Sequence, residues 1–137
     1  MVRGAIENVV RNAVRHTADG TSVDISLERR DLDGRPTAVI EVRDHGPGVP
    51  EKVVPSLFVP FYRGAHAHGD TQTGTGLGLA ITRRVFEVHG GTATAANARG
   101  GGFVVSLELP LHVPGGLDQP LADTRQTQEH GNAITAA

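Results

Sequence analysis

The stretch Gly74-Thr75-Gly76-Leu77-Gly78-Leu79 decides how this sequence is interpreted, because alternating glycines lead directly into a helical pattern. Residues 77–89 carry apolar side chains at helical spacing and are followed by Gly90-Gly91, a common way for a helix to end. Backbone N–H groups at a helix start lie at the positive end of the dipole and bind anions. The stretch therefore predicts an anion-binding loop that continues as a helix.

Two common phosphate-binding motifs do not account for these glycines. Their spacing is Gly-x-Gly-x-Gly, and a loop rich in Gly, Thr and His precedes them where a dinucleotide-binding Rossmann unit has a strand. The sequence also contains no Gly-x-x-x-x-Gly-Lys-Ser/Thr, which excludes a P-loop.

One further helix and four strands are predicted around this stretch. Residues 2–16 place apolar side chains three and four apart, which predicts an amphipathic helix. No capping residue precedes it, so we expect the chain to begin inside an element. Residues 23–27 and 39–42 alternate apolar and polar side chains on either side of an Asp-Gly turn and predict a β-hairpin. Residues 92–96 and 103–109 predict two more strands.

The order of these elements predicts an α+β fold, a two-layer α/β sandwich with helices on one face of a mixed, mainly antiparallel sheet. Residues 51–58 add one or two helical turns. We expect one domain over residues 1–112. Residues 113–137 contain few large apolar side chains and are expected to form a disordered tail, because they bury too little surface to offset their ordering entropy.

The bulk composition narrows the classes of function. The formal net charge is -2, which provides no broad attraction to nucleic acid. No apolar run is long enough to cross a membrane, and no cysteine is present to form a disulfide or a thiolate metal site. We expect a cytoplasmic domain that binds no nucleic acid and meets a membrane only through other parts of a longer protein.

Polar side chains on the first predicted helix form a candidate metal and phosphate site. Asn8 and Asn12 are four residues apart, so both lie on one face, and Arg15 and His16 follow a turn later. Amide oxygens are ligands for Mg²⁺, and Arg15 is suited to phosphate oxygens. The alternative is a pair of solvated amides on an exposed face.

The segment Asp44-His45-Gly46-Pro47-Gly48 follows a predicted strand and forms a second candidate site. Its glycines allow the backbone to approach a flat ligand closely, and the carboxylate can accept a hydrogen bond from an exocyclic amine. The alternative is a turn in which Asp, Gly and Pro serve geometry alone.

Taken in order, these segments resemble the N, G1, F and G2 boxes of sensor histidine kinases. The matching segments are Asn8-x-x-x-Asn12-Ala13, Asp44-x-Gly46-x-Gly48, Phe58-Val59-Pro60-Phe61-Tyr62-Arg63 and Gly74-x-Gly76-x-Gly78. The resemblance covers roughly residues 2–110. It implies the Bergerat ATP-binding fold, shared with gyrase, Hsp90 and MutL, in which a nucleotide lies between the first helix and a flexible lid.

The resemblance also implies roles for individual residues, with ATP and Mg²⁺ as cofactors. Asn12 would hold Mg²⁺, Asn8 would support the metal shell, and Asp44 would accept from the amino group of adenine. Phe58 and Phe61 would anchor the base of a lid formed by residues 63–75. The implied nucleotide-binding residues are Asn8, Asn12, Arg15, His16, Asp44, Gly46, Gly48, Phe61, Gly74, Gly76, Leu77 and Gly78. The implied catalytic residues are Asn8, Arg15 and Arg63.

The residue at position 8 separates transfer from hydrolysis within this superfamily. Relatives that hydrolyse ATP have a glutamate four residues before the metal asparagine, where it acts as a general base. This chain has Asn8 there, and an amide cannot take a proton at neutral pH. Glu7 is one residue away, about 100° around the helix. We therefore expect phosphoryl transfer rather than hydrolysis.

The expected phosphate acceptor is a histidine on a separate dimerisation domain, for relay to a response regulator. None of the seven histidines lies in the family's His-Glu-Leu/Phe-Arg-x-Pro context, and the two strands usual before the first helix are missing. We expect weak ATP binding and no autophosphorylation by the isolated chain. A full-length parent would be anchored in the inner membrane, and an exposed sheet edge could pair two copies.

Two other functions fit the same residues. A serine kinase of the anti-sigma-factor class shares the N and G boxes, and a nucleotide-binding fragment without transfer activity would fit the missing front of the domain.

Relatives commonly have an Ala-Arg pair in the lid where this chain has Ala67-His68, so phosphate contact by the lid would depend on pH. The alternative, a transition-metal site at His66 and His68, lacks a third ligand.

Overall fold

The structure is a computed structural model that describes residues 1–63 and 76–112. In chain order its elements are α1 (Val2–His16), β1 (Asp24–Leu32), β2 (Arg35–Arg43), the 3-10 helix η1 (Glu51–Phe58), α2 (Gly78–Val88), β3 (Thr92–Asn97) and β4 (Phe103–Pro110). These elements confirm the predicted helices and strands. The predicted tail and most of the predicted lid lie outside the described residues.

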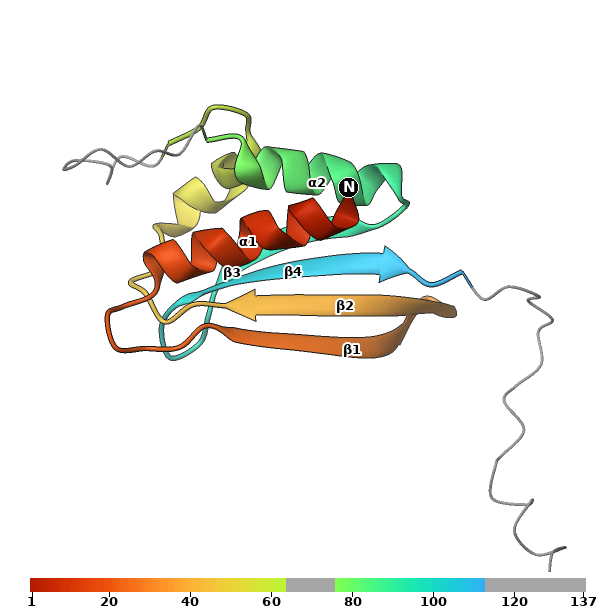
Figure 1. The fold of residues 1–137 in the computed structure, drawn as a ribbon, viewed down its shortest axis with the longest axis horizontal. Helices are drawn as coiled ribbons and strands as arrows, with labels where there is room; N and C mark the ends of the chain where they lie inside the picture. The colour runs from red at the N-terminus through yellow and green to blue at the C-terminus, as the bar shows by residue number, and fades with distance from the viewer. Residues whose placement is uncertain (64–75, 113–137) are drawn as a thin grey trace, which may run out of the picture.

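The four strands form one sheet in the order β1-β2-β4-β3, and each neighbouring pair is antiparallel (Figure 1). The parallel pairing of a mixed sheet does not occur among the described strands. The predicted hairpin is confirmed, with Leu32 opposite Arg35. Asp33 and Gly34 connect these strands with φ of 52° and 73°. Two positive φ values in a two-residue loop suit the right-handed twist of the flanking strands.

Both α-helices cover the same face of the sheet, which confirms the predicted two-layer α+β sandwich (Figure 1). The core lies between the layers because each element turns its apolar stripe inward. Phe86 of α2 and Leu107 of β4 are fully buried. The buried cluster consists of Ala5, Val9, Ala13, Val42, Phe58, Phe86, Ala93, Phe103, Val105 and Leu107.

The outer strand β1 is less covered than its sequence predicts. Ile25 and Leu27 alternate with polar residues as in a half-buried strand, yet they are 56% and 71% exposed. The reason is that α1 and α2 pack on β2, β3 and β4, so the described helices do not reach over β1.

One end of the sheet gathers the segments that the sequence analysis singled out. The C-terminal end of α1, the end of β2, the β3–β4 turn and η1 all lie at the left of Figure 1. This convergence brings residues far apart in the chain into one site.

Candidate nucleotide site

The first part of the site is the face of α1 that carries the two asparagines. Asn8 and Asn12 are both half-buried, while Ala5, Val9 and Ala13 on the same helix are buried in the core. Asn8 lies beside Gly78, the first residue of α2, where an added Cβ would be 3.9 Å from the Asn8 Cβ. The structure thus brings the first asparagine to the start of the glycine-led helix.

A buried threonine fixes the position of α2 against α1. The Thr82 side chain is 0% exposed, and its hydroxyl donates toward the carbonyl oxygens of Ala5, at 3.1 Å, and Gly78, at 2.9 Å. A buried hydroxyl needs such partners to offset its loss of water. The sequence analysis missed Thr82, although a polar residue on the apolar side of a helix, four positions after Gly78, is a usable signal.

Arg15 and His16 occupy the last turn of α1, and both are exposed. Arg15 forms no ion pair with another described residue. The His16 carbonyl lies against Gly46, where an added Cβ would overlap the carbonyl oxygen. One helix therefore lies beside the start of α2 at Asn8 and packs against the loop that starts at Asp44 through the His16 carbonyl.

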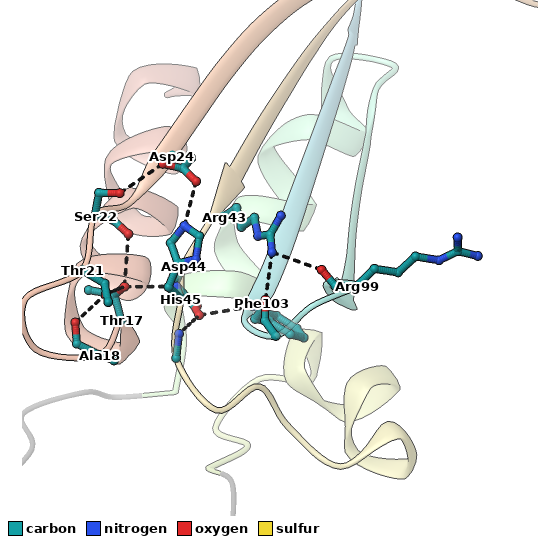
Figure 2. Close-up of polar contacts among 12 residues, drawn as sticks. Thr17, Ala18, Thr21, Ser22, Asp24, Arg43, Asp44, His45, Arg99 and Phe103 are labelled. Atoms are coloured by element: carbon teal, nitrogen blue, oxygen red, sulfur yellow. Dashed lines mark hydrogen bonds and ion pairs between the residues drawn. The ribbon is translucent and has the colours of Figure 1, made fainter.

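Asp44 is 5% exposed and lies immediately after β2. Its Oδ1 atom accepts hydrogen bonds from the N–H of Gly46 at 2.9 Å and of Phe103 at 3.2 Å. The Asp44 N–H donates to the Phe103 carbonyl at 2.9 Å (Figure 2). Within the described residues Oδ2 has no hydrogen-bond donor. The loop therefore uses one carboxylate oxygen for its own structure and leaves the other as an acceptor for a ligand.

Close contacts within the protein also require the two glycines of this loop. Gly46 packs on the end of α1, as described above. Gly48 has a φ of 69°, and an added Cβ would lie 2.5 Å from the Asn97 Oδ1 atom. From the sequence, these glycines were expected to admit a base. The structure adds a second reason for them, the approach of α1 and β3 to the loop backbone.

His45 ties the loop to the segment between α1 and β1. Its N–H donates to the Thr17 hydroxyl oxygen at 3.1 Å, and its Nε2 atom lies 2.7 Å from Asp24 Oδ2 (Figure 2). The hydrogen bond from His45 lowers the pKa of Asp24 below its ordinary value. The sequence analysis assigned no role to Thr17, Asp24 or His45, because nothing in the local pattern links them.

Arg43 holds the β3–β4 turn against the end of β2. Its Nη2 atom donates to the carbonyl of Arg99 at 3.2 Å (Figure 2) and to the carbonyl of Gly101 at 3.1 Å. Gly102 has a φ of 89°, and an added Cβ there would overlap the Asp44 carbonyl oxygen. The turn therefore supports Asp44 directly.

The F segment precedes the predicted lid, and the position of Phe61 differs from the expectation. Phe58 is buried, with the Arg83 guanidinium 5.2 Å from its ring centroid. Phe61 is 73% exposed with a φ of 64°, so its side chain does not pack at the base. Its N–H instead donates to the Gly76 carbonyl at 3.1 Å. This backbone bond links two described stretches, one on either side of residues 64–75.

The remaining predicted residues are only partly within the described chain. Arg63 is exposed, Gly76 has a φ of 69°, and Leu77 immediately precedes α2 without a side-chain capping hydrogen bond. Gly74, His66 and His68 lie outside the described residues. Within residues 1–63 and 76–112, no group of three His, Cys, Asp or Glu side chains is placed to hold a metal ion.

Glu7, the neighbour of Asn8, forms an ion pair away from the candidate site. Its carboxylate pairs with Arg3 at 2.8 Å, and both side chains are exposed. This position on the outer side of α1 agrees with the expectation that Glu7 does not replace the general base of ATP-hydrolysing relatives.

Comparisons with known proteins agree with this geometry. The family described as histidine kinase-, DNA gyrase B- and HSP90-like ATPase matches residues 1–113. The chain belongs to this family. More narrowly, it is similar to the ATP-binding catalytic domain of histidine kinases. The signal transduction histidine-protein kinase AfsQ2 of Streptomyces coelicolor is 38% identical over 126 residues, which are 92% of this chain and 22% of that protein.

Two solved structures extend the likeness to three dimensions. The mycobacterial sensor histidine kinase MprB superimposes with a TM-score of 0.65 at 31% identity, covering 77% of this chain and 69% of that one. Full-length ShkA in complex with AMPPNP gives a TM-score of 0.58 at 28% identity, covering 82% of this chain and 22% of that one. The chain thus spans about a fifth of the whole kinases AfsQ2 and ShkA.

Proposed function

We propose that this catalytic domain binds ATP with Mg²⁺ and transfers the γ-phosphate to a histidine on a separate dimerisation domain. The observation that carries the proposal is the position of α1, which lies beside Gly78 at Asn8 and packs against Gly46 at His16. A single rigid helix thereby fixes the distance between a loop suited to a base and a helix start suited to phosphates.

In this proposal Asp44 Oδ2 accepts from the amino group of adenine, because Oδ1 already receives two N–H groups. The amide oxygens of Asn12 and Asn8 suit Mg²⁺, a hard cation that prefers oxygen ligands. When bound, Mg²⁺ would neutralise charge on the phosphates. The remaining contacts to ribose and phosphates are assigned to Arg15, His16, Arg63, Gly74, Gly76, Leu77 and Gly78.

Transfer is favoured over hydrolysis for a reason that lies in α1. Asn8 cannot accept a proton from water, and Glu7 is paired with Arg3 on the exposed side. In the transfer, the bond between the γ-phosphorus and the bridging oxygen of ADP breaks, and a bond to an imidazole nitrogen of the acceptor forms. The attacking imidazole supplies its own nucleophile, so the domain contributes positioning and charge stabilisation.

The proposed partners are a histidine-bearing dimerisation domain and a response regulator that receives the phosphate on an aspartate. Among the residues the structure describes, no helix combines the length and apolar character needed to cross a membrane. As a separate part of the proposal, a full-length parent kinase would be anchored in the inner membrane.

Calorimetric titration with AMPPNP, with and without Mg²⁺, tests the nucleotide site. We expect Mg²⁺-dependent binding that is lost in Asn12→Ala and Asp44→Ala but retained in Asp31→Ala, which removes an exposed carboxylate of β1. A folded wild-type chain that binds no nucleotide would refute the proposal.

Adding a dimerisation domain and ATP then separates the alternative functions. Formation of phosphohistidine would support a histidine kinase, and formation of phosphoserine on a protein substrate would support a serine kinase. Nucleotide binding without phosphoryl transfer would support a regulatory fragment.

The expected pairing of two copies also stays a proposal. It is supported by β1, an outer strand whose Ile25 and Leu27 side chains are more than half exposed. An antiparallel pair centred on Leu27 would place Asp24 opposite Arg30 of a second copy. A purely monomeric mass in light scattering at high concentration would contradict it.

A further inference from the structure

A single side chain from β3 binds both backbone groups of Val49, near the end of the loop that starts at Asp44. The Asn97 Oδ1 atom accepts the Val49 N–H at 2.9 Å, and its Nδ2 atom donates to the Val49 carbonyl at 2.7 Å. Nδ2 also lies 2.7 Å from Glu51 Oε1. The carboxamide thus gives Val49 the pair of hydrogen bonds that a neighbouring strand would otherwise supply.

The contact between Asn97 and the loop leaves no room for a side chain at position 48. Gly48 is the residue whose added Cβ would come within 2.5 Å of Asn97 Oδ1, and its φ of 69° already favours glycine. Removing the carboxamide would take away the partners of both Val49 backbone groups. Because Val49 is half-buried, water replaces these partners only in part.

Asn97 and Phe103 are opposite each other in the β3–β4 ladder, and together they hold both ends of the loop. Phe103 exchanges hydrogen bonds with Asp44, through its carbonyl to the Asp44 N–H and through its N–H to Oδ1. The Asn97 side chain likewise binds the N–H and the carbonyl of Val49. One cross-strand pair therefore sets the span of residues 44–49.

We propose that Asn97 is a positioning residue of the nucleotide site, which holds the Val49 end of the loop so that Asp44 Oδ2 meets the amino group of adenine. The inference rests on the proposed function. Without Asn97 the β3–β4 hairpin loses its hydrogen bonds to the Val49 end of the loop and keeps its contacts at the Asp44 end. Nucleotide binding must then order the loop at a cost in conformational entropy.

The test compares binding of AMPPNP and of inorganic tripolyphosphate to the full chain, each with Mg²⁺, by calorimetry. Asn97→Ala should weaken AMPPNP binding about tenfold, which corresponds to the loss of roughly one net hydrogen bond, and leave tripolyphosphate binding unchanged. Glu51→Ala is the matched control and should bind both ligands like the wild type, because the bridge to Val49 remains.

Asn97→Asp provides a second variant of the same size. It keeps the acceptor for the Val49 N–H but places a carboxylate oxygen where Nδ2 lay 2.7 Å from both the Val49 carbonyl oxygen and Glu51 Oε1, so its AMPPNP affinity should fall at least as far as that of Asn97→Ala. Unchanged AMPPNP binding in both variants would overturn the proposal. A parallel loss for both ligands that follows the melting temperature would also overturn it, since it would indicate a purely structural role. A wild-type chain that binds no nucleotide would instead refute the proposed function.

Discussion

Replacing Thr82 by valine keeps the volume of the side chain and removes the hydroxyl that ties α2 to α1. The hydroxyl donates toward the Ala5 and Gly78 carbonyls inside a fully buried site. Both carbonyls lie within helices and keep their intrahelical partners. The change therefore costs about one net hydrogen bond, and the desolvation penalty that the hydroxyl no longer incurs offsets this cost only in part. We expect a loss of about 1.5 kcal/mol in the free energy of unfolding.

For a domain of this size, a loss of about 1.5 kcal/mol lowers Tm by roughly 6–12 °C. Thermal melting followed by circular dichroism measures the shift, and urea unfolding measures the free energy independently. Thr82→Ser is the control, because it keeps the hydroxyl and removes only a methyl group. The two variants separate the hydrogen bond from packing.

The same substitution has a functional consequence. Thr82 bonds to Gly78, and Gly78 lies beside Asn8, so a looser contact between the helices should also weaken Mg²⁺-dependent binding of AMPPNP. A Thr82→Val chain as stable as the wild type would refute the reasoning. So would a Thr82→Ser chain less stable than Thr82→Val, since packing would then outweigh the hydrogen bond.

Two further predictions concern the support of the Asp44 loop. Gly100→Ala and Gly102→Ala place a Cβ at similar φ values of 84° and 89°, but only the second meets the Asp44 backbone. Urea unfolding should show a loss of roughly 1–2 kcal/mol for Gly100→Ala and a clearly larger loss for Gly102→Ala; equal losses would contradict the close contact. The lowered pKa of Asp24, caused by its hydrogen bond with His45, contributes stability that is present above the ordinary value of 3.8 and is lost as the pH falls through the lowered pKa. The difference in Tm between wild type and Asp24→Asn should thus be present at about pH 5 and vanish in stronger acid, and a difference that grows on acidification would disprove the assignment.

The secondary structure could be predicted from the sequence because its signals are local. Apolar spacing marks α1 and α2, alternation marks the hairpin, and positive-φ turns are marked by Asp33-Gly34 and by the glycines before β4. The order of the four motifs also indicates the family from the sequence alone. Burial of β1 could not be predicted in this way, because alternation shows which side chains share a face and not what covers that face.

What only the tertiary structure decided is how the loop at Asp44 is held. Asn97 reaches Val49 across 48 positions, and Arg43 reaches the β3–β4 turn across 56 and 58. His45 meets Asp24 across 21 positions. Such contacts leave no periodic trace in the sequence, since they depend on which strand ends the fold brings together. The sequence by itself determined the elements and the family, and the antiparallel sheet order determined which side chains support the site.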